Sequence, residues 1–205
     1  MSNPSGSAVR DAIRARRTVF RFKPGEVPRD VLTEILTAGT WSPNHLLTEP
    51  WRFTVIGPEM KATLGERYRE IQAEKCAPGT APEHVAAAGE KGWLKWMSKP
   101  TVVFVSCVLD GDEQRVRENT AAVSCAMLNM QLAAGEMGVG MQWSTGPITM
   151  EQNTYGLLAI DSAEEYIVGL CYMGSPAEVG ASTRRPGSWR RAMTSSTRSP
   201  IRRSL

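Results

Sequence analysis

Hydrophobic positions in the first quarter of the chain follow helical spacing and then give way to a strand pattern. Val9 and Ile13 lie four residues apart, on one side of a short helix that ends in an arginine cluster. Pro28 stands at the first position of a second amphipathic helix, which should stop near Gly39. Residues 52–56 read as a strand that is closed by a Gly-Pro pair. Two helices followed by a strand are therefore expected here.

The middle of the chain predicts two more helices and a fully covered strand. Pro58 opens an amphipathic helix, residues 76–82 form a loop, and a second helical stretch ends before Pro100. Residues 101–109 are apolar without polar alternation, which is typical of a strand covered on both faces. This strand is expected in the middle of a sheet.

A long helix follows, over residues 113–137. From Ala121 onward it is rich in alanine and methionine on nearly every side, so it must be buried almost all round. Gly138 is placed to end it as a C-terminal cap. Residues 139–143 and 166–173 supply two further strands. The order of elements predicts an α+β or three-layer arrangement in one domain.

Composition agrees with a soluble, folded protein. The chain has 205 residues, 41% hydrophobic and 22% charged. Its longest strongly apolar run, residues 102–109, is far shorter than the roughly 20 residues that cross a membrane. The N-terminus has no apolar segment typical of a secretory signal, so we expect a cytoplasmic protein without a membrane partner. The four cysteines are at least 18 residues apart, which argues against a zinc site, and no metal is expected.

The net charge of +3 hides an asymmetry. Residues 182–205 carry seven arginines and no acidic residue, so the rest of the chain is acidic. We expect one domain over residues 1–181 and an Arg-rich extension over 182–205, docked at its start and mobile at its end. A basic tail can also bind nucleic acid or anionic lipid. A basic-tailed binding module therefore stays open as an alternative from another class, although no nucleic-acid partner is expected.

The sequence lacks the usual catalytic motifs. The glycine run at 135–140 lies between a helix and a strand, the reverse of the order in a dinucleotide-binding loop. No nucleophile elbow or zinc-protease motif occurs, and the chain has only two histidines. If the protein is an enzyme, a cofactor is expected to carry the chemistry, and no catalytic side chain is assigned.

Four short segments carry candidate binding groups. Arginines beside a hydroxyl suit a phosphate, because a guanidinium makes bidentate charge-assisted bonds. A proline-bounded loop can present donors and acceptors to a heteroaromatic edge, and a strand end can offer backbone N–H groups. Each also has a structural reading: a solvated helix end, a turn cap with an exposed loop histidine, or a plain strand end. The candidates are Arg16, Arg17 and Thr18; Asn44, His45 and Glu49; Trp143, Ser144 and Thr145; and Arg184 and Arg185.

Together these parts resemble the nitroreductase-like family of FMN enzymes, in particular its short branch. The resemblance covers roughly residues 8 to 186 and lies in the order and spacing of the parts. It implies a three-layer nitroreductase-like fold, with a central mixed sheet flanked by helices, in a domain-swapped homodimer with FMN at the interface. The motifs that carry it are Arg16-Arg17-Thr18, Arg21-Phe22, Trp41-Ser-Pro43 through Pro50-Trp51-Arg52-Phe53, Met137-Gly138-Val-Gly140, Trp143 to Gly146, and Ile167 to Pro176.

The resemblance also implies roles for the candidates. Arg16, Arg17 and Thr18 would hold the phosphate and ribityl end of FMN, and Arg184 or Arg185 would close on the phosphate. Residues 143–145 would lie along the ring near N5. Asn44 and His45 would come from the other subunit.

Glu49 departs from the family pattern. It stands where the usual loop, Pro-Ser-Ser-x-Asn-x-Gln-Pro-Trp, has glutamine. An acid at the pyrimidine edge would oppose the negative charge of reduced flavin, so Glu49 either turns away or lowers the redox potential.

The implied activity is hydride transfer from NADH or NADPH, through flavin N5, to a nitroaromatic, a quinone or another small acceptor. The protein would position the reactants, donate a hydrogen bond to N5 and supply positive potential over the reduced ring. No protein acid or base would be strictly needed. Other flavin chemistry on the same fold, namely reductive dehalogenation or flavin breakdown, is the alternative within the family.

Overall fold

Helices and strands follow one another in the expected order along the chain. The computed structural model describes residues 8–177, and no helix in that range is long and apolar enough to cross a membrane. Short 3-10 turns occur at His45–Leu47 and Pro147–Thr149. The elements are α1 (Ala8–Ala15), α2 (Arg29–Thr40), β1 (Trp51–Val55), α3 (Pro58–Glu74), α4 (Pro82–Met97), β2 (Thr101–Val108), α5 (Glu113–Glu136), β3 (Gly140–Ser144), α6 (Gln152–Leu157) and β4 (Glu165–Gly174).

The four strands form one sheet in the order β1-β2-β4-β3. The expectation of a mixed sheet is wrong for these strands, because all three pairings are antiparallel. The parallel contact is an isolated bridge between Thr18 and Met141, where the segment after α1 runs beside β3. The expected central position of the 101–109 strand is confirmed, since β2 pairs on both sides.

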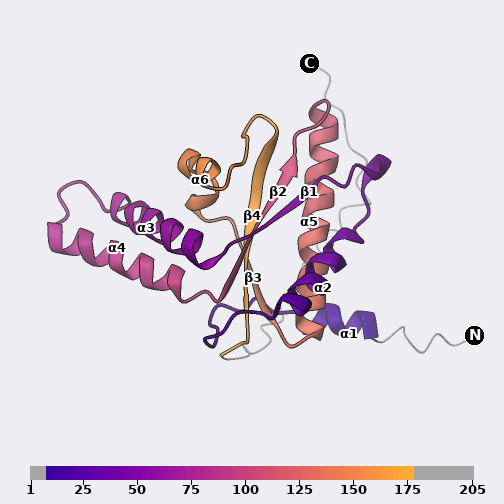
Figure 1. The fold of residues 1–205 in the computed structure, drawn as a ribbon, viewed down its shortest axis with the longest axis horizontal. Helices are drawn as coiled ribbons and strands as arrows, with labels where there is room; N and C mark the ends of the chain where they lie inside the picture. Colours follow the sequence, from indigo (N-terminus) through magenta and orange to yellow (C-terminus); the bar gives the residue numbers. More distant parts are fainter. Residues whose placement is uncertain (1–7, 178–205) are drawn as a thin grey trace, which may run out of the picture.

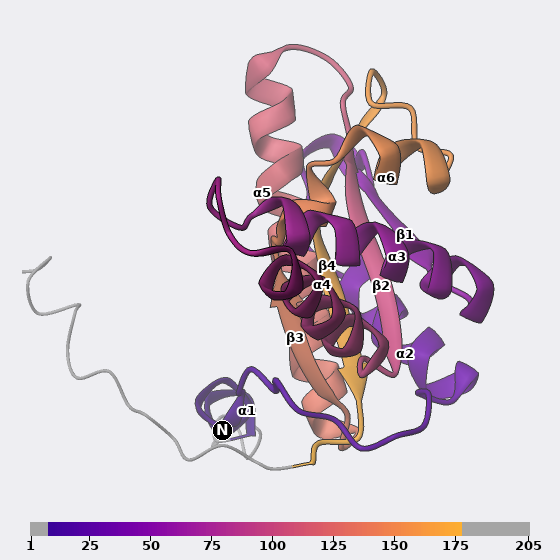
Figure 2. The ribbon, with the colours of Figure 1, turned by 90° about the vertical axis from the view of Figure 1, so that its left-hand side faces the viewer.

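Side chains of β2 divide between two cores, one on each face of the sheet. Val103 and Val105 pack with α2 and α5, whereas Val102 and Phe104 pack with α3, α4 and α6. The continuous apolar run is thus a strand covered on both faces. Figure 1 shows α2 and α5 on one side of the sheet and the α3–α4 pair extending from the other, and Figure 2, viewed from the α3–α4 side, shows this pair in front of the sheet. The three-layer α+β architecture is confirmed.

Helix α5 is capped at both ends and supplies many of the buried side chains of one core. Asp112 accepts a 2.9 Å hydrogen bond from the N–H of Arg115 at its start. Gly138 follows its end with φ of +72°, a conformation that favours glycine, so the expected cap is confirmed.

The expectation that α5 is covered on nearly every side is wrong for the single chain. An apolar stripe along it stays exposed or half-buried, and Leu128 in that stripe is 45% exposed. The remaining faces are closed by the sheet and α2. The stripe consists of Ala121, Cys125, Leu128 and Leu132.

Candidate functional site

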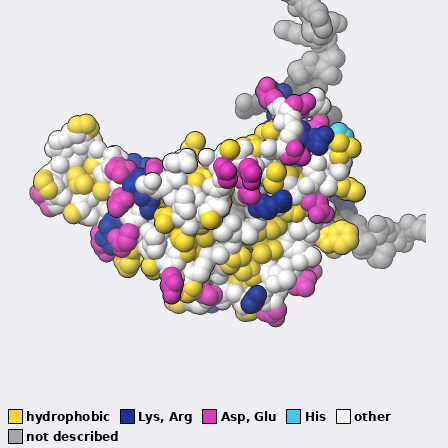
Figure 3. All heavy atoms as spheres, turned by 45° about the horizontal axis from the view of Figure 1, so that its top comes forward, with side chains coloured by type: hydrophobic (Ala, Val, Ile, Leu, Met, Phe, Trp, Pro, Cys, Tyr) yellow, Lys and Arg dark blue, Asp and Glu magenta, His cyan; other side chains and the backbone are white. Residues whose placement is uncertain are grey.

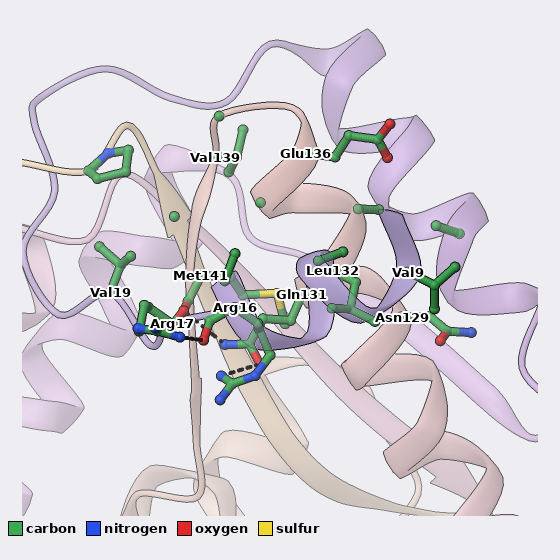
Figure 4. Close-up of a pocket in the computed structure, with 18 of the residues that line it drawn as sticks. Val9, Arg16, Arg17, Val19, Asn129, Gln131, Leu132, Glu136, Val139 and Met141 are labelled. Carbon is green, nitrogen blue, oxygen red and sulfur yellow. Dashed lines mark hydrogen bonds between the residues drawn. The ribbon is translucent and has the colours of Figure 1, made fainter. Parts of the chain in front are cut away.

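A pocket of about 950 Å³ lies where α1, the C-terminal half of α5 and the start of β3 meet. Most of its lining is small or apolar, and Arg16 and Arg17 supply its positive charge (Figure 4). At Gly140 an added Cβ would come within 2.9 Å of the Val19 side chain, so glycine lets these two segments approach closely. Glu136 of α5 also lines the pocket, away from the two arginines. A largely apolar pocket with two adjacent arginines suits an elongated ligand with an anionic end.

Gln131 connects the walls of this pocket. Its side-chain oxygen accepts a 3.2 Å hydrogen bond from Arg16, and its Nε2 donates to the carbonyl of Met141 at 3.3 Å and to that of Arg17 at 3.5 Å. Gln131 is buried in α5. Gln131 is not among the residues predicted from the sequence, although an amide within an Ala/Met-rich buried stretch needs polar partners and is a signal in itself.

Arg17 lines the pocket and also closes the end of α1. Its Nη1 donates to the carbonyls of Arg14 and Arg16 at 2.6 and 2.7 Å. A cation is favourable there because the C-terminus of a helix carries partial negative charge. Thr18 stands beside the pocket at its bridge to Met141. The structure therefore brings Arg16, Arg17 and Thr18 together.

The 44–49 loop lies at the opposite end of α5. Nδ1 of His45 is 2.6 Å from a carboxylate oxygen of Glu118, and this hydrogen bond lowers the pKa of Glu118. Glu118 and Gln131 are thirteen residues apart on α5, which corresponds to about 20 Å of helix. Within one chain, Asn44, His45 and Glu49 therefore do not join the arginines.

Backbone strain is concentrated in this loop. Leu46, Leu47 and Glu49 all have positive φ, at +57°, +54° and +43°. Non-glycine residues adopt such angles at a cost that other contacts must offset. The side-chain oxygen of Asn44 accepts a 2.9 Å hydrogen bond from the N–H of Glu49, so Asn44 does cap a turn. The two leucines are largely exposed, with Leu47 at 82%.

The 143–145 segment continues β3 beyond the pocket lining. Trp143 lies against Gly169 of β4, where an added Cβ would come within 2.6 Å of the indole nitrogen. Ser144 lies near Tyr172, whose pKa is raised mainly by burial. Thr145 is exposed at the strand end. Arg184, Arg185 and the 182–205 extension lie outside the described residues.

Replacing Gln131 with leucine is expected to lower the free energy of unfolding by about 1–3 kcal/mol, because three hydrogen bonds across the pocket walls are lost. Urea unfolding of the wild type and the variant measures this. Gln152→Leu is the matched control, because Gln152 is exposed on α6, and it should stay within about 0.5 kcal/mol of the wild type. Equal stabilities of all three proteins would show that the Gln131 bridge contributes nothing.

Comparisons with known proteins agree along most of the chain. A sequence model described as "Nitroreductase family" matches residues 13–175. A relative from Bacillus subtilis, named putative NAD(P)H nitroreductase YfhC, is 29% identical over 181 residues, which are 87% of this chain and 90% of the relative.

Solved structures show the same likeness. A nitroreductase-like family protein from Bacillus cereus has a TM-score of 0.75 at 25% identity, covering 93% of this chain and 96% of the other. A structure from Desulfovibrio desulfuricans, described as a putative nitroreductase in complex with FMN, has a TM-score of 0.64 at 26% identity, covering 91% and 94%.

Proposed function

This chain belongs to the nitroreductase family, and on this premise we propose that it is an FMN-dependent NAD(P)H oxidoreductase. The electron acceptor in this proposal is a nitroaromatic, a quinone or another small molecule of that kind. The observation that carries it is the largely apolar pocket in which Arg16 and Arg17 stand together at the end of α1. The family expected from the sequence motifs is confirmed, and the α+β fold of the described residues agrees with it.

The residues that line the pocket fit FMN. Its volume of about 950 Å³ lies within the range of pockets that hold cofactors, and its apolar walls suit a flavin ring. Arg16 and Arg17 would bind the phosphate, with Thr18 beside them toward the ribityl chain. When bound, FMN supplies a ring that accepts two electrons from NADH or NADPH and passes them on. The chain itself would bind and orient FMN and exclude water from the pocket.

A second copy of the chain completes the site in this proposal. The exposed stripe on α5 needs cover, and the loop with Asn44, His45 and Glu49 lies about 20 Å along α5 from the arginines of its own chain. In a homodimer with α5 at the interface, this loop would reach the pocket of the partner. Figure 3 shows that hydrophobic side chains are widely exposed on one face of the single chain.

The remaining candidates have proposed roles toward the ring and the phosphate. Residues 143–145 would present backbone N–H groups near the flavin, since the strand that lines the pocket leads directly to them. Glu49 would turn away from the pyrimidine edge or lower the potential. The 1–181 region would be the FMN-binding domain, with Arg184 or Arg185 of the extension closing on the phosphate.

The test begins with the absorption spectrum of the purified protein and a titration with FMN. We expect a yellow protein with one FMN per subunit, and anaerobic bleaching of the flavin by NADH or NADPH in a stopped-flow spectrophotometer. Steady-state kinetics with a nitroaromatic or a quinone should give parallel-line ping-pong plots, because one site serves both substrates in turn. A colourless protein that binds no FMN would refute the proposal, and FMN that neither nucleotide bleaches would refute the reductase activity.

A further inference from the structure

Lys99 is a buried lysine between α4 and β2. Its side chain lies on the face of the sheet away from α5 and is only 4% exposed. Nζ donates to the carbonyl of Phe20 at 2.8 Å and to the side-chain oxygen of Gln142 at 3.2 Å. The rings of Phe22 and Tyr172 lie 5.1 and 5.0 Å from it. A buried ammonium held by neutral groups alone is costly, and proteins place such charges at sites that use them.

Among residues 8–177, no acidic group pairs with this charge. No Asp or Glu oxygen in that range forms an ion pair with Nζ, whose partners there are neutral oxygens and ring faces. The titratable groups that act near it are Tyr172, which burial keeps neutral by raising its pKa, and Lys95. Burial and, to a lesser extent, the charge of Lys95 together lower the pKa of Lys99 to about 8.

Both hydrogen-bond partners of Lys99 stand directly behind the wall of the candidate pocket. Phe20 follows Val19 and Gln142 follows Met141, and Val19 and Met141 both line the pocket. These two lining residues are bonded to each other, because the N–H of Val19 donates to the carbonyl of Met141 at 3.1 Å. Lys99 therefore links the segments of Val19 and Met141 through the residue that follows each of them. Its charge lies behind the pocket wall.

We propose that Lys99 supplies positive charge behind the flavin wall and so favours the binding of reduced FMN over oxidised FMN. The proposal rests on the binding of FMN in this pocket. Reduced flavin carries negative charge, and a cation in a water-poor interior attracts it more strongly than it would in water. The coupling is reciprocal, so reduction of bound FMN must raise the pKa of Lys99.

Variants that remove or keep the charge test this directly. Lys99→Gln keeps a hydrogen-bond donor without the charge, and Lys99→Arg keeps the charge. We expect Lys99→Gln to weaken the binding of reduced FMN relative to oxidised FMN by about five- to tenfold, seen as a lower midpoint potential of bound FMN. Lys95→Gln, which removes an exposed lysine one turn earlier, is the matched control and should change this ratio by less than about twofold.

A measurement on the wild type covers the case in which the Lys99 variants do not fold. With lysine side chains labelled with ¹³C, the pKa of Lys99 is followed by NMR with oxidised and with reduced FMN. A rise of about one unit on reduction is expected. An unchanged pKa, or an unchanged binding ratio in a folded Lys99→Gln protein, would overturn this proposal alone. A wild type that binds no FMN would overturn the proposed function as well.

Discussion

The Met130→Asp variant is expected not to fold. Met130 has no exposed surface, and it packs in the core between α5, α2 and the sheet, against Gly39. The substitution would remove a large apolar side chain and bury a carboxylate without a partner, which together cost at least about 4 kcal/mol. That is a large part of the stability of a domain of this size. Circular dichroism and urea unfolding should show no cooperative transition.

Leu128→Asp places the same charge two residues away on the same helix, with a different expected result. Leu128 is 45% exposed in the single chain, so a carboxylate there stays hydrated and the subunit should fold. In the proposed dimer the charge would be buried, so we expect a folded monomer with much weaker FMN binding. Sedimentation velocity at micromolar concentration measures the association. A wild type that is monomeric with FMN bound, or a Leu128→Asp protein that is dimeric, would refute this interface.

Arg17→Ala is expected to weaken FMN binding by about 1.5–3 kcal/mol, or about 10- to 150-fold. The guanidinium lines the pocket and would make a charge-assisted bond to the phosphate. Fluorescence titration of the apoprotein measures the dissociation constant. The affinity for riboflavin, which lacks the phosphate, should change little.

Two controls separate phosphate binding from the cap that Arg17 forms on α1. Arg14→Ala removes the same charge from the last turn of α1, but the Arg14 side chain does not line the pocket, so FMN should bind nearly as in the wild type. If the loss came from a loosened α1, Arg17→Ala would weaken FMN and riboflavin alike. Unchanged FMN affinity in Arg17→Ala would remove the phosphate site from the proposal.

The sequence predicts best those elements whose signals are local. The apolar run of β2, the Ala/Met pattern of α5 and the glycine after it each depend on neighbours within a few residues. The sheet type was missed because strand direction depends on how distant segments pair. Nothing in the 101–108 run itself distinguishes an antiparallel partner from a parallel one.

The site is harder to predict because its contacts join distant segments. Arg16 meets Gln131 across 115 positions, and Lys99 meets Phe20 across 79. In the sequence Lys99 looks like an ordinary solvated lysine at a helix end, and its burial becomes evident only with the sheet assembled. The arginine cluster could be predicted, since residues 16–18 are consecutive. The separation of Asn44 and His45 from that cluster within one chain follows from the length of α5.

The separation of the two residue groups along α5 has a genetic consequence if the dimer forms as proposed. Each of the two sites in a dimer would take its arginines from one chain and its 44–49 loop from the other. Two variants with weakened FMN binding, one altered at Arg17 and one in the loop, would then complement each other when produced together. Their heterodimer would contain one doubly defective site and one intact site, so the mixture would bind FMN better than either variant alone.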